Sequence, residues 1–484
     1  MGHDTSAWWH GIESTPMLGL AILGFVAIGL LVAFLAPRQL PSRIRTLYQA
    51  VDEKPEAYPN ASVFPPSRRA ALEKLLPRSQ IVKKENVVPV ADLKRNQLTT
   101  KETQDLNRKD QFTPTGILTQ EIKALGKFPD YSVLSGVPHP KPNPSFDISK
   151  AVFRPFRPFR WNYHQTMSLM KMESDYWIEL EHNYFTRMKQ RIDIWEQHGE
   201  RIMFEAPGSE LASRELMEMV LQNICIKYPH YFQLEENNTI LRNRLLDTSI
   251  VIGSMPALEV LYRTIPEDFA VMCRNEEDGM YYLRSAMVCS SVGWNIGLHK
   301  NKILRKIHDA VPQWEEKMAF SVDRWFTKLP TDAPVQRGSW GIEDWEAFFC
   351  PEDHPRSAFH DNASACKVED LQLRCDWQTL RRLPISGAVV FNFKAVFTPL
   401  VELAKEPYVP ALLHRVITQG QRELISYKME PHVKQVAEEA LERWAKKQEE
   451  DGVTEAGWQV GTLEESPFFP GWQESADFGG CPCR

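Results

Sequence analysis

Hydrophobic and polar residues divide the chain into stretches of different pattern. Residues 17–36 form an unbroken run of twenty residues without a charge. At ~1.5 Å per residue, a helix of this length spans the ~30 Å hydrocarbon layer of a bilayer. Residues 37–150 are polar and rich in proline, whereas periodic apolar positions extend from about Phe153 to about Lys447. The pattern predicts one N-terminal transmembrane helix, then a tether, then a globular body.

The charges that flank the apolar run predict its orientation. Arg38, Arg43 and Arg45 follow the run, and no Lys or Arg precedes it. A cleaved signal peptide would have a shorter apolar region, preceded by positive charge. By the positive-inside rule, residues 1–16 are extracytosolic and the C-terminal domain lies in the cytosol. We therefore expect a single-pass membrane protein in contact with the lipid bilayer, with the endoplasmic reticulum as its default membrane.

Proline is concentrated in the tether, because residues 37–158 hold sixteen of the 34 prolines. Such a segment buries too little apolar surface to offset the entropy lost on ordering, so 37–150 is predicted to be largely disordered. Apolar periodicity is also missing from 451–484, which is predicted to be a flexible C-terminal tail. These boundaries leave 151–450 as the folded domain.

The folded domain mixes helical and strand patterns. The predicted helices cover 175–195, 210–225 and most of 415–447, and the predicted strands cover 281–288, 371–383 and 388–393. A hairpin turn at Pro384–Gly387 joins the last two strands. Mixed elements with hairpins predict an α+β fold, in which helices flank an antiparallel sheet.

Composition and motifs exclude several classes of function. The 57 Lys and Arg against 63 Asp and Glu give a net charge of −6, which argues against a partner of nucleic acid. The chain lacks a phosphate-binding P-loop, a dinucleotide-binding glycine motif, a His-Glu-x-x-His zinc motif and a hydrolase Gly-x-Ser-x-Gly motif. Eight cysteines in 484 residues do not form a disulfide framework.

One candidate for chemistry lies in the segment 300–312. Ile303, Leu304, Ile307 and His308 share one stripe of a predicted helix that Pro312 limits. His308 then lies in the last turn, where the helix dipole favours a histidine. On this interpretation His308 is a core residue with only a structural role. Alternatively, an imidazole on an apolar helix face is suited to ligate a haem iron.

A second candidate is the arginine pair Arg381 and Arg382. Because neighbouring residues of a strand point to opposite faces, one of them is expected to face the core. A buried guanidinium requires an anion. That anion is either a protein carboxylate, such as Asp323 or Glu369, or a carboxylate of a bound ligand.

A series of segments in one order resembles a known family, the haem-dependent oxidative N-demethylase alpha-subunit-like proteins, which include many fungal members of unassigned role. The resemblance covers roughly residues 155–450. It rests on PFRWNYHQTMSLMKMESDYWIELE (158–181), PEDFAVM (266–272), residues 293–312 with their IHDAVP ending, SVDRWF (321–326) and TLRRLPISGAVVF (379–391).

The resemblance implies a PAS-like fold that binds haem b and demethylates a small N-methyl amine with O₂, releasing formaldehyde. It implies a separate electron donor with flavin and iron–sulfur centres that uses NAD(P)H. His308 is the expected axial ligand, with His299 as its competitor. Arg381 and Arg382 are expected near the haem carboxylates, and no catalytic residue is assigned. The alternatives are a non-catalytic haem or small-ligand sensor and a scaffold that has lost the cofactor.

Overall fold

A computed structural model describes residues 122, 124–275, 278–292, 294–346, 348–351 and 366–474, all within the compact unit 60–484. The predicted membrane helix at 17–36 and most of the predicted tether lie outside these residues. In the part that is described, no helix has the length and apolar character needed to cross a membrane.

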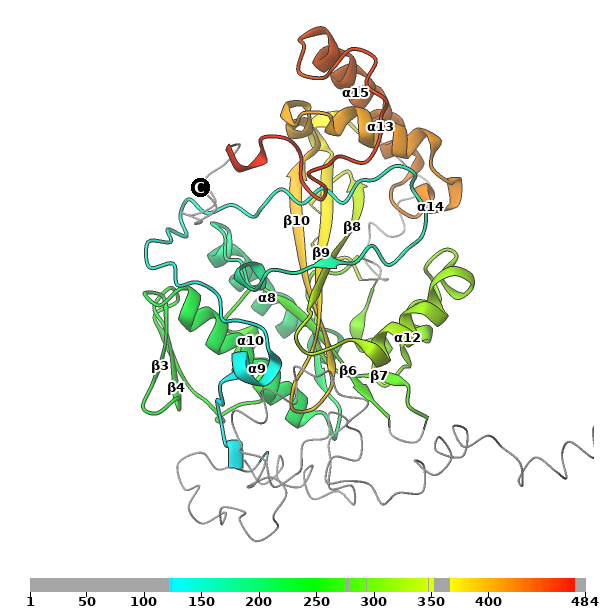
Figure 1. The fold of residues 1–484 in the computed structure, drawn as a ribbon. Coiled ribbons are helices and arrows are strands. Elements are labelled where there is room, and N and C mark those ends of the chain that lie inside the picture. Colours follow the sequence, from blue (N-terminus) through cyan, green and yellow to red (C-terminus); the bar gives the residue numbers. More distant parts are fainter. Residues whose placement is uncertain are drawn as a thin grey trace, which may run out of the picture. The chain divides into compact units, whose positions relative to one another are not determined.

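The centre of the described region is a seven-stranded antiparallel sheet with strand order β1-β8-β9-β10-β6-β7-β2. Its strands are β1 (Met170–Lys171), β2 (Met203–Glu205), β6 (Asp268–Arg274), β7 (Tyr281–Met287), β8 (Val335–Glu343), β9 (Gln372–Arg382) and β10 (Val389–Pro399). A separate antiparallel sheet contains β3 (Phe232–Glu235), β4 (Ile240–Asn243) and β5 (Thr248–Val251). Figure 1 shows the long strands β8, β9 and β10 side by side.

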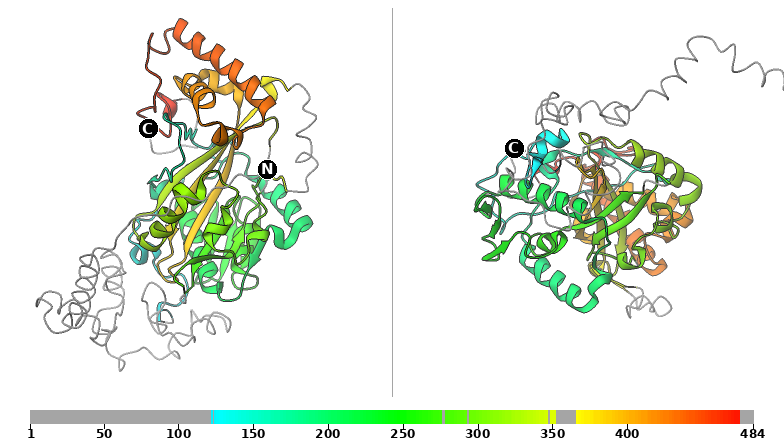
Figure 2. Two further views of the ribbon diagram at one scale, coloured as in Figure 1. Left: turned by 90° about the vertical axis from the view of Figure 1, so that its right-hand side faces the viewer. Right: turned by 90° about the horizontal axis from the view of Figure 1, so that it is seen from below.

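Helices cover both faces of the sheet and one end of its long strands (Figures 1 and 2). The helices of eight or more residues are α8 (Tyr184–His198), α9 (Glu210–Lys227), α12 (Phe320–Lys328), α13 (Val409–Gln419) and α15 (Pro431–Glu450). The shorter ones are α7 (Tyr131–Ser135), α10 (Ala257–Tyr262), α11 (Leu304–Ile307) and α14 (Arg422–Ser426). Pro410 and Pro431 lie in the first turns of α13 and α15, where a proline leaves no helical hydrogen bond unmade.

Three hydrophobic clusters form the core, and the β9–β10 hairpin contributes side chains to all of them. The first cluster packs α9 and α10 on one sheet face, where it contains Trp177 and Val390. The second packs α13 and α15 on the far end of the hairpin around Trp377. The third packs α11 and α12 on the opposite face, where it contains Leu380 and Val389. The sheet therefore separates two differently lined faces.

Several predicted elements are confirmed, and others differ for physical reasons. The predicted helix 210–225 is α9, and the predicted strands 281–288, 371–383 and 388–393 are β7, β9 and β10. The predicted helix 175–195 begins only at Tyr184, because Trp177 and Ile178 insert into the core instead. The α+β class with a large antiparallel sheet and flanking helices is confirmed.

The folded region extends beyond the predicted domain boundaries. Residues Tyr131, Leu134 and Phe146, which belong to the predicted tether, have buried side chains in the first core cluster. Phe469, in the predicted tail, is 4% exposed and packs in the second cluster. Sparse apolar residues among prolines are enough to fasten these segments to the domain, which the composition alone does not reveal.

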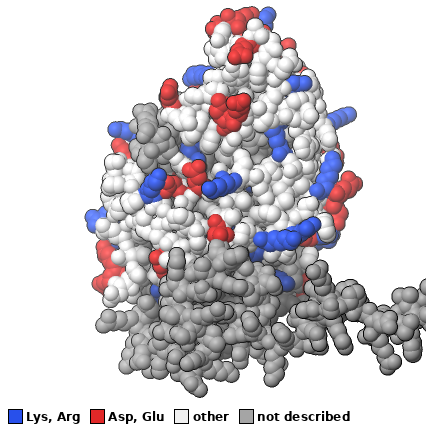
Figure 3. Space-filling model, in the orientation of Figure 1, with Lys and Arg blue, Asp and Glu red and all other residues white. Residues whose placement is uncertain are grey.

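On the face drawn in Figure 3, basic and acidic side chains of the described residues are interspersed. The charge of this face is therefore mixed, without a large patch of one sign.

Candidate functional site

His308 ends the short helix α11 and lies among aromatic rings. Its ring stacks on Trp314 with centroids 4.2 Å apart and planes at 17°, and Trp294 lies 5.8 Å away. His308 Nδ1 is 3.0 Å from the carbonyl oxygen of Leu304. A carbonyl can only accept, so Nδ1 carries the proton and Nε2 keeps its lone pair. His308 therefore has the tautomer of a histidine that binds a metal through Nε2.

The surroundings of His308 favour its neutral form. Loss of solvent, with a smaller contribution from the positive charge of Arg337, lowers the pKa of His308 to about 4. The hydrogen bond to Leu304 acts in the opposite direction. The imidazole is therefore uncharged at neutral pH and needs no deprotonation before it binds a cation.

The helix predicted around His308 is shorter than the sequence indicates. Backbone hydrogen bonds join Leu283 N to Lys302 O at 3.0 Å and Asn301 N to Leu283 O at 2.8 Å. These bonds attach residues 301–302 to β7, so helical geometry begins only at Leu304. A π-helical turn at Glu315–Ala319 follows Trp314, and turns of this kind are frequent at functional sites.

His299 belongs to the same aromatic group as His308. Its ring lies 5.5 Å from that of Trp294, and its buried Nδ1 has no hydrogen-bond partner within the described residues. Loss of solvent, followed by the charge of Lys302, lowers the pKa of His299. Both imidazoles therefore stay candidates for a ligand, and His308 is the one whose second nitrogen is held.

A group of cations lies near His308, and we call Arg160, Arg337 and Lys428 the Arg337 cluster. Arg337 follows Val335 by two residues on β8, so it points to the same sheet face as the third core cluster. Its buried Nε has no partner among the described residues, and loss of solvent and Arg160 lower the pKa of Arg337 to about 10.

Neutral oxygens satisfy the other two members of the Arg337 cluster. Arg160 donates to the carbonyl oxygen of His164 at 2.9 Å, and Lys428 Nζ donates to Ser339 Oγ at 2.8 Å. Loss of solvent lowers the pKa of Lys428 to about 8, whereas nearby Asp376 raises it.

Asp376 does not neutralise the Arg337 cluster by itself. It accepts from Arg374 at 2.7 and 2.9 Å, so its charge is already balanced. Within the described ranges, none of the ion pairs involves a member of the cluster. The cluster is a partly buried surplus of positive charge beside a neutral imidazole.

The structure uses Arg382 to hold the sheet against α12. Its guanidinium donates to the carbonyl oxygens of Leu329 at 2.6 Å and Gly387 at 2.7 Å, to Tyr281 Oη at 2.9 Å, and to the carbonyl oxygen of Phe326. Gly387 has φ of 73°, which glycine adopts without strain in the hairpin turn. These bonds use four of the five N–H donors of the guanidinium. A contact of Arg382 with a haem carboxylate stays a prediction.

The carboxylates that the sequence suggested for the arginine pair are placed elsewhere. Asp323 is hydrogen-bonded to Arg305, and Glu369 is exposed. Neither of these two carboxylates therefore pairs with the arginines, and neutral oxygens take the place of a carboxylate around Arg382. Glu215 is the acid whose charge reaches Arg381.

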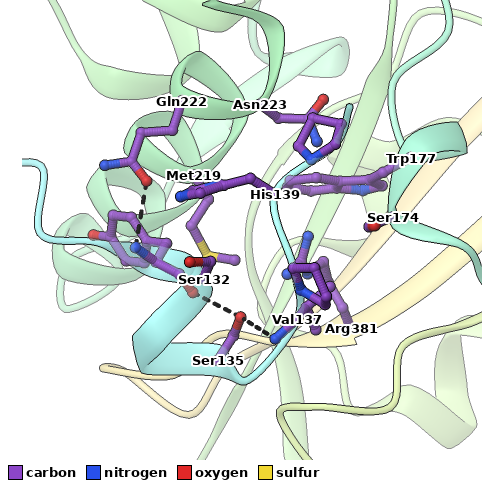
Figure 4. Close-up of a pocket in the computed structure, with 13 residues that line it drawn as sticks. Ser132, Ser135, Val137, His139, Ser174, Trp177, Met219, Gln222, Asn223 and Arg381 are labelled. Carbon is purple, nitrogen blue, oxygen red and sulfur yellow. Dashed lines mark hydrogen bonds between the residues drawn. The ribbon is translucent and has the colours of Figure 1, made fainter. Parts of the chain in front are cut away.

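Arg381 lies on the opposite sheet face from His308. Its guanidinium lies 4.1 Å from the ring centroid of Trp177, a residue of the first core cluster. Arg381 also lines a small cavity next to α7 and α9 (Figure 4). The structure thus brings His308 and Arg382 to one face, and it does not bring Arg381 to them.

Sequence reasoning missed Arg337, Lys428 and Trp314. The alternation of 335–343 would have placed Arg337 on one face of a strand, but the lack of a carboxylate partner follows only from the fold. The described residues hold no group of three or more His, Cys, Asp or Glu side chains that could bind a metal ion. This part of the chain therefore offers a metal ion single imidazoles among aromatic rings, those of His308 and His299, and no set of three ligands.

A comparison with protein-family models places these features in a family. The model described as "haem-dependent oxidative N-demethylase, alpha subunit-like" matches residues 168–438, more than half of the chain. The match includes His308, Arg337, Arg381, Arg382 and Lys428. The chain therefore belongs to the haem-dependent oxidative N-demethylase alpha-subunit-like family.

Proposed function

We propose that the folded domain binds haem through His308 and acts as an oxidoreductase that uses O₂ to demethylate a small N-methyl amine, with release of formaldehyde. Membership of the haem-dependent family supports the binding of haem. The observation that carries the proposal for this chain is the state of His308, whose proton is held on Nδ1 by Leu304 while Nε2 has no hydrogen bond to the described residues.

The donor set around His308 fits a flat apolar ring that carries two carboxylates. Trp294, Trp314 and the partly buried Phe391 and Phe393 supply aromatic surface on this face. The Arg337 cluster supplies positive charge that no carboxylate of the described residues neutralises. Arg337 Nε is a buried donor without a partner among the described residues, and a ligand carboxylate would accept its hydrogen bond.

In this proposal haem supplies the activation of O₂ and the oxidation beside the amine nitrogen. His308 holds the ligand position as a neutral base, and Leu304 keeps its ring from turning. Trp294 and Trp314 exclude water from the imidazole. Their indole faces also suit an ammonium ion, since a cation is attracted to the face of an aromatic ring.

Other parts of the proposal rest on the sequence and the family. We propose that the cofactor is haem b, that the fold is PAS-like, and that electrons come from a separate NAD(P)H-dependent donor with flavin and iron–sulfur centres. We propose further that residues 17–36 anchor the protein in the lipid bilayer, with the folded domain in the cytosol and the endoplasmic reticulum as the membrane.

Haem titration of the full-length chain in detergent tests the proposal. We expect a Soret band for the unaltered protein, its loss or shift in His308→Ala, and its retention in the matched variant His299→Ala. Retention in His308→Ala with loss in His299→Ala would transfer the ligand role to His299. A protein that stays colourless with excess haemin would refute haem binding.

Formaldehyde release then separates the oxidoreductase from a haem sensor of the same fold. The haem-loaded chain is incubated with O₂, an artificial electron donor and a series of N-methyl amines. Turnover by the unaltered protein and none by His308→Ala supports the enzyme. A stable Soret band without consumption of any amine supports the sensor.

A further inference from the structure

A small cavity lies on the sheet face opposite to His308, between α7, α9 and the end of β9. Its volume is about 20 Å³, and Figure 4 shows Ser135, His139, Trp177, Asn223 and Arg381 among the residues around it. A space of this size holds one or two water-sized groups, since one water needs ~10–15 Å³. The half-buried His139 brings the rim of the cavity to the surface.

Arg381 is the unusual residue of this cavity. It is 5% exposed, its Nε has no partner, and its side chain forms no hydrogen bond or ion pair with any residue of the described part. Glu215 is the acid whose charge reaches it, but Glu215 already accepts from the backbone N–H groups of Ile385 and Ser386. Loss of solvent lowers the pKa of Arg381 to about 10. A guanidinium in this position is stabilised chiefly by the ring of Trp177.

Two neighbours of Arg381 in the cavity also have unused polar atoms. Trp177 Nε1 and Asn223 Oδ1 are buried, and neither has a hydrogen-bond partner among the residues that the structure describes. Asn223 is 6% exposed on α9, and Trp177 is 2% exposed. Buried polar atoms are nearly always paired in folded proteins, so the two unpartnered donors beside one cavity, Arg381 Nε and Trp177 Nε1, indicate a bound acceptor. Asn223 Oδ1 is itself an acceptor, so a carboxylate does not complete it.

We propose that this cavity binds the carboxylate group of a small ligand, with Arg381 as the anion-binding residue. A single negative charge balances one guanidinium, and the two oxygens of a carboxylate match its fork of N–H donors. The volume admits a carboxylate head and excludes a porphyrin ring. The site is separate from the proposed haem site, because Arg381 and His308 lie on different faces of the sheet.

Acetate binding to the haem-free full-length chain tests the proposal. Acetate is titrated at constant ionic strength, with chloride as the balancing ion, and followed by calorimetry and by the melting temperature. We expect saturable binding and a rise in melting temperature. Arg381→Gln is expected to weaken acetate binding at least tenfold, whereas the exposed control Arg244→Gln keeps it.

A second variant keeps the test decisive where Arg381→Gln fails to fold. Asn223→Asp places a carboxylate in the same cavity, so the melting temperature is expected to rise without acetate and the response to acetate to vanish. Equal acetate binding by the unaltered chain and Arg381→Gln would overturn the proposal. So would the absence of saturable binding, which indicates that water alone fills the cavity, or tighter binding of phosphate than of acetate. Each result is independent of whether the chain binds haem.

Discussion

Replacement of Arg337 by methionine is expected to stabilise the haem-free protein and to weaken its binding of haem. Arg337→Met keeps a long unbranched side chain and removes the charge. Loss of solvent lowers the pKa of Arg337 from its ordinary range to about 10 in the folded chain, and each pH unit is worth roughly 1.4 kcal/mol. The cost of burying this unneutralised cation is therefore ~3 kcal/mol, and the lost guanidinium contacts reduce the expected gain to ~1–3 kcal/mol.

The sign of this effect follows from protonation. The folded pKa lies below the unfolded one, so the folded chain holds the proton less strongly. At pH 7 both states are protonated and the whole cost is present. It disappears only as the pH rises through about 10 toward the unfolded value.

Urea unfolding of the haem-free full-length chain at pH 7 measures the gain in stability, and Soret titration measures haem affinity. We expect haem affinity to fall about tenfold or more, which corresponds to ~1.4 kcal/mol. Arg324→Met is the matched control, because Arg324 is exposed and its loss should change stability by less than ~0.5 kcal/mol. A loss of stability in Arg337→Met, or unchanged haem affinity, would refute the reasoning that this charge is kept for a ligand.

Three further outcomes are expected. Asp268→Asn should destabilise the domain by ~3–5 kcal/mol in urea, because it leaves the fully buried Arg191 without its ion-pair partner; a loss below ~1 kcal/mol would contradict this. Burial raises the pKa of Glu343 to about 7, so the folded chain holds this proton more strongly than the unfolded chain. The melting temperature should therefore fall as the pH rises from about 4.5 to 7, and Glu343→Gln should remove most of that fall. Deletion of residues 17–36 should move the protein from the membrane pellet to the supernatant on fractionation, and a pellet that stays unchanged would argue against the anchor.

The sequence predicted the main antiparallel sheet well where burial patterns are local. The alternation in 281–288 and the hairpin around Gly387 depend on residues that are neighbours in the chain, and both strands of that hairpin are found. Strand β8, which lies between the short edge strand β1 and β9, was harder to predict. Its sequence VQRGSWGIE contains glycines and polar residues that dilute the alternation.

The candidate site was predictable only in part, for reasons of long-range packing. The apolar stripe around His308 was visible in the sequence, and the hydrogen bond from Nδ1 to Leu304 completes it. The Arg337 cluster assembles residues 160, 337 and 428, and its lack of an ion pair within the described residues is a property of the fold. Likewise, Arg381 and Arg382 were recognised as opposed, but their different surroundings depend on Trp177 and Tyr281 from other elements.

The hairpin of β9 and β10 has a consequence for how the domain melts. Each strand is eleven residues long, and its side chains complete three separate apolar cores. Peeling this ribbon away would open all three at once, so none can survive as a folded remnant. Calorimetry of the folded domain should then show a single heat-absorption peak, with equal van't Hoff and calorimetric enthalpies.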